Sequence, residues 1–226
     1  RIGKYGPDGK PRAIPGHNVG FAVVGVFVLW FGWFGFNAGS ELAMDNWVAH
    51  CIMTTLLAGS AGVVGAGAAI WRKTGAMDVG MAGNGALAGL VSITAGTGTM
   101  SFAGSVAVGF IGGVIVVYSV LFIERRGIDD PVGAVSVHGV CGAWGTLAIG
   151  FFARHDDAFL GRDDAGLFYG GGFDQLLVQA IGVVIVAVWV LGTTAILFKV
   201  LKSTVGLRVS AEEELAGLDV AEHGSP

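Results

Sequence analysis

Charge is scarce in this sequence. Aspartate, glutamate, lysine and arginine make up 13% of the 226 residues, whereas soluble domains average about 25%. Hydrophobic residues account for 53%, and the mean hydropathy is +0.70. This shortfall of charge points to a lipid environment. The net charge of −4 adds little, because in a membrane protein the placement of charges matters more than their sum.

Several chemical signatures are also missing. The two cysteines, Cys51 and Cys141, lie in separate apolar segments, so we expect buried packing thiols rather than a CxxC pair or a metal site. No basic tract suggests nucleic-acid binding, and no glycine-rich phosphate loop precedes a helix. We therefore expect no cofactor, no metal and no nucleic-acid partner.

What the sequence does contain is a series of six apolar segments. They predict an all-α membrane protein with six transmembrane helices, since a span needs about 20 residues. The third segment is short and contains Asn84, Ser92 and Thr94, so a re-entrant or interfacial segment is the alternative there. The chain then divides into a cytoplasmic loop (1–18), a transmembrane domain (19–200) and a cytoplasmic tail (201–226). The predicted helices are 19–38, 47–71, 79–95, 102–123, 132–152 and 176–198.

The basic residues fall almost entirely on one side if the six spans alternate. Eleven lie there, and only Arg154 and Arg162 lie opposite, among several acidic residues (Glu41, Asp45, Asp156, Asp157, Asp163, Asp164 and Asp174). This bias follows the positive-inside rule and favours the third segment as a true crossing. It predicts that both ends of the chain are cytoplasmic. Because residue 1 is Arg and no signal peptide is present, we expect a C-terminal part of a longer polypeptide.

Glycine is abundant, with 40 residues and no collagen-like period of three. Small residues let membrane helices approach closely, and spacings of three or four place them on one helical face. We therefore expect packed helices rather than helices isolated in lipid. The glycines expected to line these faces are Gly62, Gly65 and Gly67, then Gly104, Gly109, Gly112 and Gly113, then Gly139, Gly142 and Gly145.

His138 is the principal polar candidate inside the membrane. Asp130 and Pro131 mark the start of its helix, since proline suits a first helical turn, and eight residues then rise about 12 Å into a hydrocarbon core about 30 Å thick. An intramembrane histidine is a functional candidate, and imidazole can both donate and accept a hydrogen bond. The alternative is a histidine bonded between helices. We expect that packing role for His50, which lies only ~6 Å deep.

The sequence WFGWFGFNAGS, residues 30–40, places aromatic rings and a hydroxyl at the outer end of the first span. Phe36 and Ser40 could hold a small cation by cation–π attraction and hydrogen bonding. The alternative is an interfacial aromatic belt, with Trp33 as an anchor or packing residue. Asn37 is interpreted as a cap for the helix end. In the tail, Ser210 and Glu213 fit a capping box, and Gly217 ends a short helix.

Three stretches carry a family resemblance. They are residues 30–40, the block DDPVGAVSVHGVCGAWGTLAIGFFA (129–153) and the tail TVGLRVSAEEELAGLDVAEHG (204–224). Together they resemble the Amt/Mep/Rh ammonium transporters. The resemblance implies an eleven-helix fold of two inverted repeats plus a last helix, assembled as a homotrimer. This chain is similar to the second repeat, the last helix and the cytoplasmic tail, and inverted repeats often place a substrate site at their interface.

The resemblance also implies site residues. Phe36 matches an aromatic of the outer phenylalanine gate, Ser40 the hydroxyl of the external ammonium site, and His138 the second of the paired pore histidines. Asp130 matches an acidic residue at the cytoplasmic start of that helix, where we expect a structural role. The other gate phenylalanine, the first histidine and the tryptophan of the external site belong to the first repeat and have no counterpart here.

The implied function is an ammonium transporter or channel of the plasma or inner membrane, acting in nitrogen uptake. Ammonium would be recruited outside and cross as ammonia, because a bare charge at mid-bilayer costs several kcal/mol. A PII-type regulatory protein is the implied cytoplasmic partner. The alternative function is an ammonium sensor coupled to such a partner. We expect no enzyme, since Cys141 and His138 share a helical face but no third group completes a catalytic set.

Overall fold

The computed structural model describes residues 2–155 and 164–224, and these form helices joined by turns and loops. Within those ranges there is no β-strand, only two isolated bridges, so the predicted all-α class is confirmed. The residues Arg1, Asp156, Asp157, Arg162 and Asp163, used in the charge argument, lie outside the described ranges. The main helices are α1 (Val19–Gly39), α2 (Asn46–Thr74), α3 (Val79–Thr94), α4 (Phe102–Arg125), α5 (Cys141–Phe152) and α6 (Asp174–Thr204). Shorter ones are the π-helix η1 (Val135–Val140), the 3-10 helix η2 (Leu167–Tyr169), α7 (Ala211–Ala216) and α8 (Leu218–His223).

The first four helices begin where a short polar side chain caps them. Each cap accepts a hydrogen bond from a backbone N–H of the first turn, which satisfies a donor that the helix leaves unpaired. The caps are Asn18 for α1, Asp45 for α2, Asp78 for α3 and Ser101 for α4. These residues explain why the helices start within a residue of the predicted spans.

Five segments are long and apolar enough to cross a membrane by length and composition: α1, α2, α4, η1 with α5, and α6. The third predicted span is the shorter helix α3, with 16 residues. It packs against α1, α2, α4 and α5. A helix surrounded by protein needs little apolar surface toward lipid, which explains its weak hydropathy.

Backbone-to-backbone contact joins α2 to its neighbours. A Cβ placed on Gly62 would collide with the Gly85 carbonyl of α3, and one on Gly113 of α4 would collide with the Gly62 carbonyl. A Cβ on Gly109 of α4 would collide with Ala58 in the same way. Side chains larger than hydrogen would push these helices apart, so the predicted glycine-lined packing holds at Gly62 of α2 and at Gly109 and Gly113 of α4. Gly85 of α3, which was not predicted, takes part in the same contact.

The predicted glycine face of the fifth segment holds only in part. Gly145 does approach the backbone of Ser92 in α3. A Cβ placed on Gly139 or Gly142, however, would meet its nearest neighbour only at 3.9 or 3.8 Å, which is ordinary van der Waals contact. These two glycines therefore do not mediate close helix packing.

The fifth helix also starts later than predicted. Residues 130–133 form a turn in which the Gly133 N–H donates to the Asp130 carbonyl at 3.1 Å, with Pro131 second in the turn and Gly133 at a φ of 73°. Proline is favoured at that turn position and glycine at its end. The Asp130 carboxylate then accepts from the N–H groups of Ala134 and Val135, at 2.9 and 3.0 Å. Helical structure therefore begins after the turn, and its first six residues, Val135–Val140, are π-helical.

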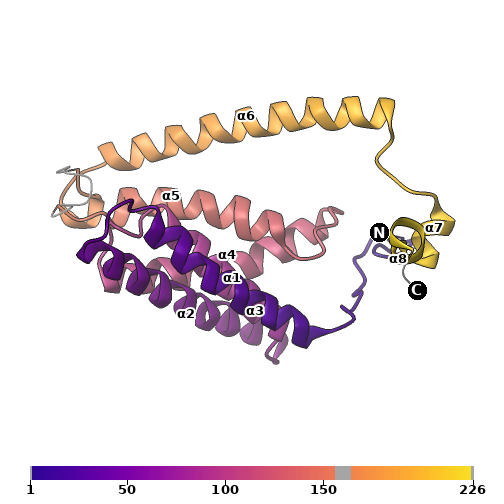
Figure 1. Cartoon of the computed structure of the whole chain (residues 1–226), viewed down its shortest axis with the longest axis horizontal. Coiled ribbons are helices and arrows are strands. Elements are labelled where there is room, and N and C mark those ends of the chain that lie inside the picture. Colours follow the sequence, from indigo (N-terminus) through magenta and orange to yellow (C-terminus); the bar gives the residue numbers. More distant parts are fainter. Residues whose placement is uncertain (1, 156–163, 225–226) are drawn as a thin grey trace.

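Figure 1 shows α6 running alongside α5, apart from the rest of the bundle. None of its 31 residues is buried, and Gly150 of α5 meets Leu176 near its start. Beyond α6 the chain reaches α7 and α8, which lie beside the start of the chain at the same end of the bundle. The position of both chain ends at one end of the bundle agrees with an even number of membrane crossings. Which side of the membrane is cytoplasmic stays a prediction.

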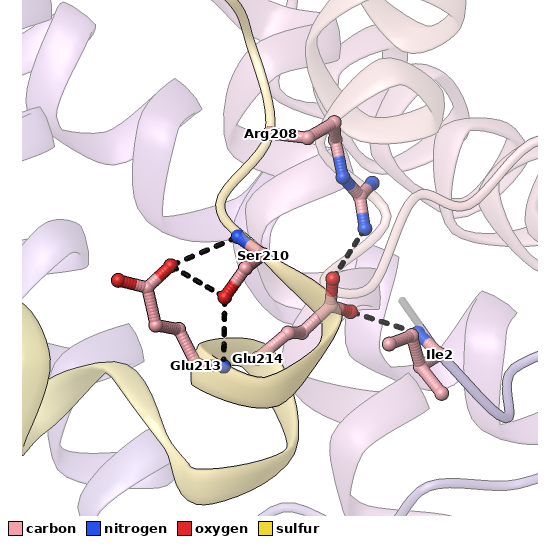
Figure 2. A network of polar contacts seen from close by, with 5 residues as sticks. All are labelled: Ile2, Arg208, Ser210, Glu213 and Glu214. Atoms are coloured by element: carbon pink, nitrogen blue, oxygen red, sulfur yellow. Dashed lines mark hydrogen bonds and ion pairs between the residues drawn. The ribbon is translucent and has the colours of Figure 1, made fainter.

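The tail contains the predicted capping box. Ser210 Oγ accepts from the Glu213 N–H at 3.2 Å, and the Ser210 N–H donates to the Glu213 carboxylate at 2.9 Å (Figure 2). Hydrogen bonds from Ser210 hold the pKa of the Glu213 carboxyl below its ordinary value. Next to it, Glu214 accepts from the Ile2 N–H at 2.8 Å and pairs with Arg208 (Figure 2). The tail is therefore attached to the loop that precedes α1.

Candidate functional site

A groove of about 590 Å³ lies between α1, the end of α3 and the η1–α5 segment. We call it the His138 groove. Most of its wall is apolar, and its polar groups are few. The lining residues are Val28, Leu29, Gly32, Trp33, Phe36, Val91, Thr94, Ala95, His138, Gly142 and Thr146. An apolar wall with a few convergent polar groups is the usual form of a small-molecule site.

His138 lies on the π-helix η1. Its ring stacks on Trp33, with the centroids 6.5 Å apart and 16° between the planes. Within residues 2–155 and 164–224, no hydrogen bond engages the ring nitrogens, so both can serve a molecule in the groove. π-Helical turns are rare and often occur at functional sites. Here the turn is tied to α4 by a hydrogen bond of 2.9 Å between Ser119 and Ser136. The imidazole is thus held by its backbone and by stacking rather than by a polar partner.

Trp33 is part of this wall, which the sequence did not predict. Its indole N–H donates to Thr94 Oγ1 at 2.8 Å, and Thr94 Oγ1 donates to the Leu90 carbonyl at 2.7 Å. Its ring also meets Phe36 edge-on, with the centroids 6.2 Å apart. The spacing of three residues from Phe36 could have placed both rings on one helical face. The indole therefore bridges Phe36 and His138.

Phe36 and Ser40 lie where the sequence placed them, at the end of α1. Phe36 lines the groove and is 59% exposed. Ser40 follows one turn later, outside the lining, and its Oγ donates to the Phe36 carbonyl at 2.6 Å. The structure thus brings Phe36 and His138 into one groove and joins Ser40 to it through the backbone.

The interpretation of Asn37 as a helix cap is wrong. Asn37 lies inside α1, is 4% exposed and donates from Nδ2 to Thr55 Oγ1 of α2 at 3.0 Å. Ser40 occupies the cap position instead. A buried amide needs a partner, and Thr55 supplies it.

Three other singled-out residues, Asp130, His50 and Cys141, are not among those that line the groove. The Asp130 carboxylate accepts from the Ala134 and Val135 N–H groups at the start of η1. His50 packs between Trp47 and Phe102, with Nε2 3.0 Å from the Met100 carbonyl oxygen. Cys141 is buried.

A protein-family model described as the Ammonium Transporter Family matches residues 1–226. The chain belongs to this family. Ammonium transporter Amt2 of Archaeoglobus fulgidus is 49% identical over 230 residues, which cover 100% of this chain and 49% of that protein. Ammonium transporter 1 member 2 of Oryza sativa is 36% identical, covering 99% of this chain and 49% of that protein.

Solved structures agree with this ammonium transporter assignment. One described as a Sensor Amt Protein has a TM-score of 0.89 and 40% identity, covering 99% of this chain and 54% of that one. Mep2 of Candida albicans has a TM-score of 0.82 and 31% identity, covering 96% of this chain and 48% of that one. The chain thus spans about half the length of the ammonium transporters it matches.

Proposed function

We propose that this chain forms one wall of an ammonium transport pathway, with the His138 groove as its lining. The observation that carries the proposal is an imidazole with both nitrogens available inside an apolar groove, in a member of the ammonium transporter family. The relatives are about twice as long, and we propose that a counterpart of their additional length supplies the opposite wall. An aqueous pore is less consistent with this lining, since most of it cannot hydrogen-bond to water.

Capture is assigned to the Ser40 end of the groove. Because the Ser40 hydroxyl donates its proton to the Phe36 carbonyl, its oxygen lone pairs remain as acceptors for the N–H groups of ammonium. The exposed Phe36 ring adds cation–π attraction, worth about 0.5–1 kcal/mol at an exposed site and more when desolvated. Together they select a small cation that also donates hydrogen bonds.

Passage along the groove favours ammonia. A charge in an apolar membrane site costs several kcal/mol, so ammonium gives a proton to water at the Ser40 end before the neutral molecule enters. His138 then offers its unprotonated nitrogen to an ammonia N–H, or its N–H to the ammonia lone pair. Ammonia then takes up a proton from water on the far side, so one proton is released and one is taken up for each molecule that crosses.

The test is methylammonium uptake by the complete gene product that carries this sequence. We expect His138→Ala to reduce saturable uptake to background, because the groove loses its imidazole. His50→Ala, which deletes an imidazole outside the groove, should retain uptake per folded molecule. Equal uptake by the His138 variant and the parent in liposomes would show that the groove is not part of the transport pathway.

A second candidate function is ammonium sensing, favoured by the 40% identity to the Sensor Amt Protein. In a sensor, the tail that contacts the loop before α1 would transmit the occupancy of the site to a cytoplasmic partner. We propose a PII-type protein as that partner. We also propose that the complete protein is a homotrimer. Saturable flux through the purified protein without any partner favours the transporter. Ammonium binding without flux favours the sensor.

A further inference from the structure

The Ser40 end of α1 is attached to the bundle at a buried polar point outside the His138 groove. Among the 21 residues of α1, only Asn37 and Ala38 are buried. The Asn37 amide donates to Thr55, and the Thr55 hydroxyl in turn donates to the Cys51 carbonyl at 2.6 Å. A buried network of this kind rigidifies the groups that it joins when all its members are satisfied.

The same network extends to the turn between α3 and α4. Thr97 Oγ1, in that turn, lies 2.8 Å from Thr54 Oγ1 and 3.4 Å from Thr55 Oγ1. It also lies 3.3 Å from the Cys51 carbonyl oxygen, the acceptor that Thr55 uses. Thr54 Oγ1 lies 2.9 Å from the Thr97 carbonyl oxygen. Thr54 and Thr55 are completely buried, so water cannot replace a missing partner without a rearrangement.

Two hydrogen-bonded connections therefore link the capture end of α1 to the end of α3 and to the turn after it. Trp33 is bonded to Thr94, and Asn37 is linked through Thr55 to Thr97. Phe36 lies between Trp33 and Asn37 on the helix. A rotation of α1 about its axis would break one of these two hydrogen-bonded connections. It would also move the Phe36 ring and the Ser40 hydroxyl together.

We infer that Thr97 is a positioning residue for ammonium capture. Its hydroxyl holds the buried network that fixes the rotation of α1, and so it sets where Phe36 and Ser40 lie relative to His138. The inference rests on the proposed function, because capture is the step that this placement serves. Thr97 itself is not among the residues that line the His138 groove.

The experiment replaces Thr97 by Val in the complete gene product, which keeps the shape and removes the hydroxyl. A first measurement is the ¹⁹F NMR spectrum of 4-fluorophenylalanine introduced at position 36, which reports the placement of that ring without any transport. A second is the KM and maximal rate of ammonium uptake. Thr99→Val is the matched control, since the one hydrogen bond of the Thr99 hydroxyl to the described part of the chain stays within the turn, to the Gly96 carbonyl. Thr97→Ser is the rescue.

We expect Thr97→Val to shift or broaden the fluorine resonance and to raise KM about threefold to tenfold. A change of this size corresponds to the free energy that one hydrogen bond typically contributes. The maximal rate should change less, Thr97→Ser should restore both measurements, and Thr99→Val should change neither. If Val prevents folding, Thr97→Ala removes the hydroxyl without adding volume and gives the same two measurements.

An unchanged fluorine spectrum overturns the inference, and so does a shifted spectrum with an unchanged KM. If the parent protein takes up no ammonium, the proposed function fails instead. The fluorine spectrum then still decides whether Thr97 positions Phe36.

Discussion

The two sides of α3 are built in different ways. Toward α2 and α4, glycines bring backbone against backbone, as at Gly62 and Gly85. Toward α1, the contacts include an indole–hydroxyl bond from Trp33 to Thr94, and only Asn37 and Ala38 of α1 are buried. The first side leaves no room for a new atom, and the second leaves a groove.

This difference separates stability from function. The seam of α2, α3 and α4 supplies dispersion contacts that any larger side chain would disrupt. The groove wall is attached at few points, so its side chains can change without disturbing the seam. Substitutions in the seam should therefore alter folding, and those in the wall should alter transport.

The largest effect is expected at Gly62. Replacing it by Val places side-chain atoms against the Gly85 carbonyl, and the cost should reach or exceed the ~1–3 kcal/mol typical of overpacking. The midpoint of thermal unfolding in detergent and the size-exclusion profile measure this loss. Gly142→Ala is the control, because its Cβ would lie 3.8 Å from Val91 in the groove wall, and its midpoint should match the parent. Equal midpoints for both variants would contradict the division between seam and wall.

A smaller effect is expected at Trp33. Replacing it by Phe keeps a ring beside His138 but deletes the donor to Thr94, a loss of about 0.5–1.5 kcal/mol. We expect the KM for methylammonium to rise several-fold, and the free energy of unfolding to fall by no more than this amount. Trp144→Phe deletes a comparable bond, from the indole to the Val108 carbonyl at 3.1 Å, but outside the groove. It should leave KM at the parent value, and a rise equal to that of Trp33→Phe would refute a local role for the indole.

The sequence predicted what depends on local pattern. Apolar length located the helices, and the short spacings at Ser210 and Glu213 identified a capping box that the structure contains. Asn37 was misjudged, and the place of Trp33 in the groove wall was not predicted, because their partners, Thr55 and Thr94, lie 18 and 61 residues away. No periodicity shows which hydroxyl will face a buried amide or indole after the helices pack.

The start of the fifth helix was misjudged for a local reason. Pro131 suits a first helical turn but equally suits the second position of a tight turn, and the sequence does not decide between them. In the structure, Gly133 adopts a positive φ at the last position of the turn, and the chain forms the tight turn instead of a first helical turn. The π-helix that follows has no sequence pattern of its own, so the surroundings of His138 could be seen only in the folded chain.

The smallest effect is expected in the tail, which belongs to neither side of α3. Hydrogen bonds from Ser210 hold the pKa of Glu213 below its ordinary value, and the Ile2 N–H followed by Arg208 does the same for Glu214. A lowered pKa in the folded state means that the stabilisation is present above the ordinary carboxyl pKa, near 4.5, and is lost as the pH falls through the folded value. Amide hydrogen exchange in α7 should therefore accelerate on acidification, after correction for intrinsic rates, while α2 stays protected. Ser210→Ala should give that fast exchange already at neutral pH, and α7 amides that exchange equally in parent and variant would show that the capping box does not hold this helix.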